Sequence, residues 1–379
     1  MMVVPSWGKR CGIYEYSKSL RGALEGLGCQ VELSSSLDRV LRVLDGRAEA
    51  SDGRLEPGSL GPLGIVPPFG MTPFDVVHLQ YEYVFYDLVA LRKFVAGLEP
   101  FNVAKVVTLH DFNWGFGDYN YFMKEAFDRI IVHSDELRSA LLRFGVAAEK
   151  VQVIPMGCQE YPLRDEEEVR CELGIGDEPT IGFFGFTLPQ KGIIELGIAT
   201  RELRRVYKGL RCFVFSALAP YESSRSYARE VFLAYNRMGL WEGVTFKSDY
   251  MPEAEVVSYL HAMDLNVLPY RERGFLGTSA AVRTLMAARK PIITTDVSFF
   301  SDLEAEVYKI PSPRPEHIVG AVKELLEDRA RREALVQRME DYVKRNSWLN
   351  TAKRHLDLYR QAMEGLPGER AVRFRWTAP

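Results

Sequence analysis

The feature that most constrains this chain is a regular alternation of short apolar runs with longer amphipathic segments. Each run is nearly continuous in apolar or β-branched residues, as a parallel sheet covered by helices on both faces requires. Two series of runs predict an α/β chain with two doubly wound domains. The first series lies at 76–80, 105–109, 129–133 and 151–154, and the second at 180–184, 211–215, 244–246, 264–269, 291–295 and 307–310.

Length and charge patterning place the domain boundary. A chain of 379 residues fits two domains. The polar run 164–170 (RDEEEVR) interrupts the strand rhythm, which favours a boundary within 159–176, although a surface helix inside one domain explains the same charges. A helical pattern opens at Ser347. We therefore expect domains at 1–165 and 166–346, followed by a C-terminal helix and tail at 347–379.

Two further segments lack regular periodicity. Residues 45–72 are rich in glycine, proline and acidic side chains and are predicted to form a long loop of the first domain. The tail at 369–379 is short, basic and aromatic. Its Arg370, Arg373, Arg375 and Trp376 could touch a membrane surface, but a frayed end is the simpler interpretation.

Composition excludes several classes of protein. The chain is 47% hydrophobic and 26% charged, which excludes disordered and coiled-coil classes. A net charge of -3 removes the electrostatic basis for a nucleic-acid partner. Five scattered cysteines without a CxxC pair argue against a disulfide framework or a zinc cluster and favour a reducing, cytoplasmic location. No apolar run approaches the roughly 20 residues that a bilayer requires, and we expect no membrane span or signal segment.

Common nucleotide and metal motifs are absent. Gly8 and Lys9 are followed by arginine and lack the earlier glycine of a phosphate-binding P-loop. Gly174 and Gly176 precede a predicted strand, whereas the glycines of a dinucleotide fingerprint follow one. The chain contains no HExxH, GxSxG or DxD sequence. We therefore expect neither a metal nor a cofactor.

Two glycine-containing segments lie where a helix is predicted to begin. Gly12 opens a helix whose apolar positions share one face, and a glycine there lets an anion approach backbone N–H groups. The segment 274–279 (GFLGTS) follows the strand at 264–269 and precedes a helix at 280–287. Its Thr278 and Ser279, with Arg283 one turn later, predict an anion site at the carboxyl end of a strand. A simple turn and a capped helix with solvated arginines are the alternatives.

Six segments carry a family resemblance. They are 10–16 (RCGIYEY), 75–82 (DVVHLQYE), 106–111 (VVTLHD), 151–157 (VQVIPMG), 182–192 (GFFGFTLPQKG) and 288–296 (ARKPIITTD). In this order and spacing they resemble the retaining sugar-nucleotide glycosyltransferases of family 4, also called group 1. The resemblance covers almost the whole chain.

The resemblance implies a fold and a reaction. The fold is GT-B, with two Rossmann-like domains whose parallel sheets face a central cleft. The first domain would bind the acceptor and the second the nucleotide sugar, and the last helix would cross back to the first domain. The reaction would move a hexose from a nucleoside diphosphate sugar to the hydroxyl of a glycan, lipid-linked or small-molecule acceptor. It would retain the anomeric configuration without a metal.

The resemblance also implies roles for individual residues. His110 would lie at the reacting sugar with Asp111 orienting it, while a histidine satisfied at a strand end is the structural alternative. Glu82 and Glu272 would contact the acceptor or donor sugar, although a surface position explains each equally. His78 and His133 lie within apolar strands and are expected to be structural. The predicted donor site consists of Gly12, Gly185, Lys191, Thr278, Ser279 and Arg283.

The chain departs from the family pattern at two places. Phe186 stands where the phosphate loop usually carries arginine, and Arg283 is expected to replace that charge. The positions of the family's paired glutamates are occupied by Leu276 and Thr284, so neither glutamate is present. A catalytically silent subunit that binds a nucleotide or glycan is therefore one alternative, and a sugar-nucleotide epimerase of similar fold is another.

Overall fold

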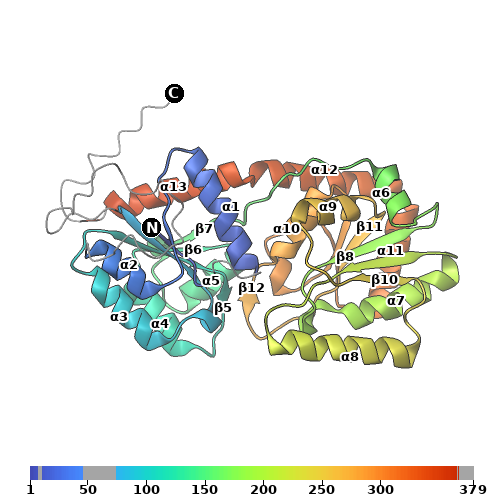
Figure 1. The fold of residues 1–379 in the computed structure, drawn as a ribbon, viewed down its shortest axis with the longest axis horizontal. Helices are drawn as coiled ribbons and strands as arrows, with labels where there is room; N and C mark the ends of the chain where they lie inside the picture. The colour runs from blue at the N-terminus through green and yellow to red at the C-terminus, as the bar shows by residue number, and fades with distance from the viewer. Residues whose placement is uncertain (7–10, 46–73, 365, 367–379) are drawn as a thin grey trace. The chain divides into compact units, whose positions relative to one another are not determined.

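The computed structural model describes residues 1–6, 11–45, 74–364 and 366 of the chain. The predicted loop at 45–72, apart from Asp45, lies outside these ranges, as do Arg10 and the tail at 369–379. Within the described residues the chain forms two compact units. The first lies within Met1–Pro155 and Leu349–Pro379, and the second is Met156–Trp348. Figure 1 shows helices around the sheet of each unit.

The first unit is built on a six-stranded parallel sheet with the order β2-β1-β3-β4-β6-β7. This order reverses between β1 and β3. The strands are β1 (Met2–Val3), β2 (Leu33–Ser34), β3 (Val76–Tyr81), β4 (Ala104–Leu109), β6 (Arg129–Val132) and β7 (Val151–Val153), with the short β5 (Asp111–Phe112) outside the sheet. The helices are α1 (Gly12–Gly26), η1 (Tyr83–Phe85), α2 (Leu37–Leu44), α3 (Leu88–Leu98), α4 (Gly117–Ala126), α5 (Asp135–Arg143), η2 (Ala148–Lys150) and α13 (Trp348–Glu364).

The core of the first unit uses helix α13, which comes from the far end of the chain. Leu358 and Ala362 of this helix pack in one buried cluster with Val106 of β4 and Ile131 of β6. Val106 lies in register with His78 of β3. The apolar run of β4 is thus buried because helices and loops cover the sheet, as the sequence pattern predicts.

The second unit has a six-stranded parallel sheet with the order β10-β9-β8-β11-β13-β14. Its strand order reverses between β8 and β11, and ligands of open α/β sheets bind outside the carboxyl ends of strands at such a point. The strands are β8 (Thr180–Phe184), β9 (Arg211–Phe215), β10 (Val244–Lys247), β11 (Leu265–Leu268), β13 (Ile292–Thr295) and β14 (Tyr308–Ile310), with the short β12 (Leu276–Gly277) outside the sheet. The helices are α6 (Glu166–Glu172), η3 (Pro189–Lys191), α7 (Ile193–Val206), α8 (Glu222–Met238), α9 (Glu253–His261), α10 (Ala280–Ala287), η4 (Ser298–Phe300), α11 (Pro315–Glu327) and α12 (Arg329–Arg345).

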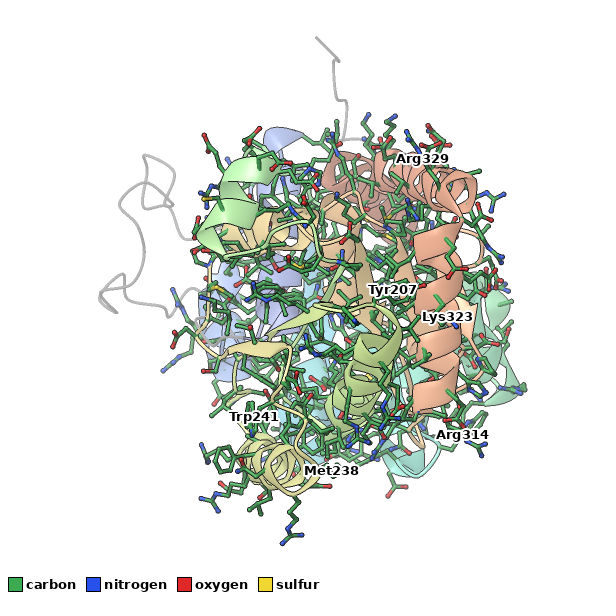
Figure 2. The ribbon with its side chains drawn as sticks, turned by 90° about the vertical axis from the view of Figure 1, so that its right-hand side faces the viewer. Tyr207, Met238, Trp241, Arg314, Lys323 and Arg329 are labelled. Atoms are coloured by element: carbon green, nitrogen blue, oxygen red, sulfur yellow. The ribbon has the colours of Figure 1, made fainter. Side chains whose placement is uncertain are left out.

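Helices α7, α8 and α11 pack together on the side of the second unit that Figure 2 presents, where Tyr207 follows α7 and Lys323 lies on α11. The Tyr207 hydroxyl donates to a carboxylate oxygen of Glu327 at 2.8 Å. Gly197 of α7 admits the Tyr235 ring of α8, since a Cβ atom at Gly197 would overlap that ring. The Tyr235 hydroxyl then donates to the Ile193 carbonyl at 2.9 Å. These contacts fix α7, which directly follows the loop after β8.

The two ends of the second unit lie side by side. The Cys158 N–H donates to the Asn346 carbonyl at 2.7 Å, and Cys158 forms a parallel bridge with Ser347. A Cβ atom at Gly157 would overlap the Trp348 ring, so only glycine fits there. The second unit is therefore a closed body that begins and ends at one point.

The observed elements match most of the predicted ones. The strands at 180–184 and 211–215 and the helix at 280–287 have the predicted bounds. The polar run at 164–170 forms much of α6, whose first turn is capped by the Asp165 carboxylate. This run is a surface helix inside the second unit, which was the alternative interpretation.

Candidate functional site

A group of side chains meets at the carboxyl ends of β8 and β11. A Cβ atom at Gly185, just after β8, would lie 3.6 Å from the Tyr270 hydroxyl oxygen and 3.9 Å from both Lys191 Cε and Ala281 Cβ. Tyr270 follows β11, and Ala281 is in the first turn of α10. The loop after β8, the end of β11 and the start of α10 thus converge at the reversal of strand order.

Glycines shape the loop after β8. Gly185 has φ 146° and its N–H donates to the Phe215 carbonyl at 3.2 Å. Gly192 has φ 68°, and a Cβ atom there would overlap the Pro269 carbonyl oxygen. Both backbone conformations favour glycine. The loop is therefore held against the ends of β9 and β11, and Lys191 is fixed beside Gly192.

Lys191 supplies the positive charge of this site. Its Nζ lies 3.8 Å from the centroid of the Tyr270 ring. Burial, and then the positive charge of Arg273, lower the pKa of Lys191 to about 7. Among the described residues no carboxylate forms an ion pair with Lys191. A buried ammonium without a negative partner is poised to bind an anion.

The start of α10 offers further hydrogen-bonding groups. Ser279 occupies the N-cap position, but its side chain does not cap the helix, and its hydroxyl lies 3.4 Å from that of Tyr270. The hydroxyl oxygen of Thr278 is buried and has no hydrogen-bond partner within the described part of the chain. The uncapped first turn of α10 and the Thr278 hydroxyl can both serve an anionic ligand.

Arg283 differs from the sequence expectation. Its guanidinium donates to the carboxylate of Asp302, and both side chains are only 5% exposed. The guanidinium carbon also lies 5.0 Å from the centroid of the Tyr342 ring. The side chain points into the unit because Val282 and Arg283 share the buried face of α10, whereas Ala280 and Ala281 are partly exposed. The guanidinium is thus bound by Asp302 and not placed as a phosphate fork.

Glu272 is exposed on the segment after β11 and is bound to a neighbouring turn. Its two carboxylate oxygens accept hydrogen bonds from the N–H and the hydroxyl of Ser298, each at 2.8 Å. The Arg273 N–H donates to the same carboxylate at 2.8 Å. Glu272 therefore fixes the start of η4 in this structure.

The first-unit candidates lie near the carboxyl ends of their own sheet. His110 directly follows β4 and is 8% exposed, and the partly exposed Asp111 comes next. Burial, and then the neighbouring His133, lower the pKa of His110 well below its usual value. Glu82 follows β3 and is partly exposed, while Gly12 is the exposed first residue of α1.

Two residues that contact candidate site residues were not predicted from the sequence. Tyr270 forms the surface beneath the Lys191 ammonium, and its place at the end of the apolar run 264–269 is the only signal that marks it. Gln80 lies 2.9 Å from the His110 ring and is fully buried. A buried glutamine inside an apolar strand is itself a signal, because buried amides need hydrogen-bond partners.

Within the ranges that the structure describes, no three His, Cys, Asp or Glu side chains gather as a metal site. No helix in those ranges combines the length and apolar character needed to cross a bilayer.

Comparison with protein families gives two matches, one in each half of the chain. Residues 69–159 match Glycosyltransferase Family 4, and residues 178–328 match Glycosyl transferases group 1. A curated relative, D-inositol 3-phosphate glycosyltransferase of Kineococcus radiotolerans, is 26% identical over 263 residues. That alignment covers 65% of this chain and 60% of the relative.

Solved structures resemble three quarters or more of the chain. A glycosyltransferase from Rickettsia africae has a TM-score of 0.70 at 13% identity, covering 96% of this chain and 98% of its own. Anabaena HepE in complex with UDP has a TM-score of 0.63 at 16% identity, covering 75% and 78%. Sucrose-phosphate synthase from Thermosynechococcus elongatus has a TM-score of 0.61 at 20% identity, covering 76% and 74%. Together with the two parallel sheets, these likenesses confirm the predicted GT-B fold.

Proposed function

Since the chain belongs to the group 1 glycosyltransferases, we propose that it moves a hexose from a nucleoside diphosphate sugar to an acceptor hydroxyl. We propose retention of the anomeric configuration and no requirement for a metal. The observation that carries this proposal is the meeting of Lys191, Gly185 and the start of α10 at the reversal of strand order in the second unit. The solved structures of HepE with UDP and with UDP-glucose support a nucleotide sugar as donor.

The proposed chemistry depends on charge that develops at the leaving diphosphate. As the bond from the anomeric carbon breaks, negative charge grows on the departing phosphate oxygen. Lys191, the N–H groups of the first turn of α10 and the Thr278 hydroxyl are the groups that would stabilise it. Gly185 leaves space for the phosphates to approach the backbone. These groups supply the positive potential that a metal provides in other transferases, which supports a metal-independent transfer.

The first unit would bind the acceptor in this proposal. His110 and Asp111 would lie at the transferred sugar, and Glu82 would accept hydrogen bonds from acceptor hydroxyls. Gly12 would leave backbone N–H groups at the start of α1 open to an anionic group of the donor. The acceptor would be a glycan, a lipid-linked sugar or a small molecule, and the reaction would take place in the cytoplasm.

A ligand panel tests the donor site. Nucleoside diphosphates and their sugars should raise the melting temperature of the wild-type chain, because a ligand of the folded state stabilises it by mass action. Lys191→Ala should weaken binding about tenfold or more, since a charge-assisted bond contributes roughly 1.5 to 3 kcal/mol. Lys208→Ala is the matched control, because Lys208 is exposed in the turn before β9, at the amino end of the sheet. Equal affinity in all three proteins would refute the assignment.

The catalytically silent subunit remains the second candidate, and one observation favours it. Leu276 and Thr284 occupy the positions of the family's paired glutamates. Donor hydrolysis or transfer by the purified protein would exclude a silent subunit. Conversion of the donor sugar to its epimer without an acceptor would indicate an epimerase instead.

A further inference from the structure

A network of buried hydrogen bonds surrounds His110 in the first unit. We propose that His133 and Gln80 are positioning residues that hold His110 as a neutral imidazole with its proton on Nδ1. This inference rests on the proposed function, in which His110 lies at the reacting sugar. It assigns roles to two side chains that the sequence analysis treated as structural or overlooked.

A hydrogen bond between His133 and the backbone fixes the position of the proton on the His133 ring. His133 Nδ1 lies 2.9 Å from the Ile154 carbonyl oxygen. A carbonyl only accepts hydrogen bonds, so Nδ1 of His133 carries the proton, and Nε2 of the neutral ring is an acceptor. His133 Nε2 lies 3.3 Å from His110 Nδ1. His110 must therefore carry its proton on Nδ1 and donate it to His133.

The other ring nitrogen of His110, Nε2, faces the Gln80 amide. With the proton on Nδ1, His110 Nε2 is an acceptor, and the Gln80 amide lies 2.9 Å from it. The same amide lies 3.3 Å from His78 Nε2. The structure places the amide oxygen toward His110, but a half turn about the terminal bond exchanges oxygen and nitrogen. The neutral network requires the exchanged orientation, with the amide nitrogen donating to His110.

The Thr351 carbonyl, at the other end of the network, leads to the same orientation of the Gln80 amide. His355 Nδ1 lies 2.8 Å from the Thr351 carbonyl, so its Nε2 accepts from the Tyr16 hydroxyl at 3.2 Å. Tyr16 then accepts from Thr108, which in turn accepts from His78 Nε2 at 2.7 Å. A proton on His78 Nε2 also suits a Gln80 amide oxygen turned toward it.

The far end of the network is consistent with this direction. His78 Nδ1, without a proton, accepts from the Tyr359 hydroxyl at 2.7 Å. Every ring in the network then has matched donors and acceptors while remaining neutral. In the alternative, His110 Nε2 donates to the Gln80 oxygen, and this needs either a second proton on His110 or two bare ring nitrogens that face each other at 3.3 Å.

Burial decides between the two arrangements. His78, His133 and His355 are at most 2% exposed, and the hydrogen bonds described above join the rings to carbonyl, hydroxyl, amide and imidazole groups. The titratable groups around His110 are His133, which directly follows β6, Tyr16 of α1 and His78 of β3, with Asp111 next in the chain. In each of these hydrogen bonds the partner of the ring is a neutral group, and burying a charged ring against neutral groups is costly.

The consequence for the proposed reaction is specific. Both ring nitrogens of His110 are used inside the unit, one as donor and one as acceptor. The ring is then a fixed dipole beside the sugar, and it does not exchange a proton during transfer. His133 and Gln80 would set its direction, so their loss should lower turnover more than donor binding.

Imidazole nitrogen NMR of the full chain tests the tautomer without any substrate. The chain has only six histidines, so the His110 signals can be assigned by comparison with His110→Asn. We expect a protonated Nδ1 and a bare Nε2 in the wild type at neutral pH. Gln80→Glu should give a doubly protonated His110, because a carboxylate accepts but cannot donate. Gln80→Met, the matched control of similar size, should leave the ring neutral. A wild-type ring protonated at Nε2 overturns the proposal.

Kinetics then test the positioning role. His133→Leu should lower kcat roughly a hundredfold, as expected when a reacting group loses its orientation, with little change in the donor KM. His133→Gln keeps an acceptor oxygen for Nδ1 and should recover much of that loss. In Gln80→Glu, kcat should rise with pH as His110 loses its second proton. Equal kcat in the wild type and in folded His133→Leu overturns the role. If His133→Leu does not fold, the kcat values of Gln80→Glu and Gln80→Met test the positioning of His110 instead. Absence of all turnover in the wild type would instead contradict the proposed function and leave the NMR result intact.

Discussion

Proton uptake should accompany nucleotide binding at the candidate donor site. The pKa of Lys191 is lowered to about 7 by burial and by Arg273, so above pH 7 the free protein holds mostly neutral lysine. A diphosphate beside Nζ favours the charged ammonium and raises its pKa again. Binding above pH 7 therefore requires a proton from solvent.

The size of this effect follows from the lowered pKa. At pH 8 about one tenth of Lys191 is charged, and each pH unit above 7 adds about 1.4 kcal/mol to the free energy of charging it. Affinity for a nucleoside diphosphate should therefore fall about tenfold per pH unit between about pH 7 and 9. The terminal phosphate itself titrates near pH 6, below this window.

Calorimetry in two buffers with different heats of protonation measures the protons taken up. We expect about one proton per nucleotide at pH 8 to 9 in the wild type. Lys191→Arg should remove the pH dependence because arginine stays charged, and Lys191→Met should bind weakly at every pH. A wild-type affinity that is constant from pH 7 to 9, or a slope that persists in Lys191→Arg, would refute the reasoning.

Three other changes test the packing that supports the two sites. Gly192→Ala should destabilise the second unit by about 1 to 3 kcal/mol in denaturant unfolding, because φ is 68° and the new Cβ would overlap the Pro269 carbonyl. Arg283→Met should lose roughly 3 to 5 kcal/mol by leaving Asp302 buried and unpaired, and adding Asp302→Leu should restore most of it. His355 has its pKa lowered from 6.5 to about 4, so the unfolded chain takes up its proton first as pH falls. Its contribution of up to about 3 kcal/mol should be complete above pH 6.5 and lost toward pH 4, and His355→Phe should flatten that part of the stability curve.

The sequence predicted the long strands well because parallel strands buried on both faces are continuous apolar runs, as at 180–184 and 211–215. It missed β1 and β2, since strands of two residues carry no periodicity and depend on neighbours distant in the chain. Gly185 and Lys191 could be proposed as site residues because they lie in 182–192 (GFFGFTLPQKG), a segment that carries the family resemblance.

The buried face of α10 could not be predicted in the same way. The residues before Arg283 are alanine, alanine and valine, which suit either face of a helix. The partner that draws Arg283 inward is Asp302, and it lies outside α10, beyond β13. The role of the Gln80 amide could not be predicted for a related reason, because its partners His78 of β3 and His110, directly after β4, meet only in the folded sheet.

The second unit lies in the sequence between the two parts of the first unit, and this order affects folding during synthesis. Helix α13, which contributes Leu358 and Ala362 to the core beside β4 and β6, leaves the ribosome only after Met156–Trp348 has been synthesised. At roughly 5 to 20 residues per second, that delay is about 10 to 40 s. During this time the first sheet lacks the helix that covers Val106 and Ile131, while the second unit can already close on itself. The nascent chain therefore presents an uncovered apolar sheet face until α13 has been synthesised.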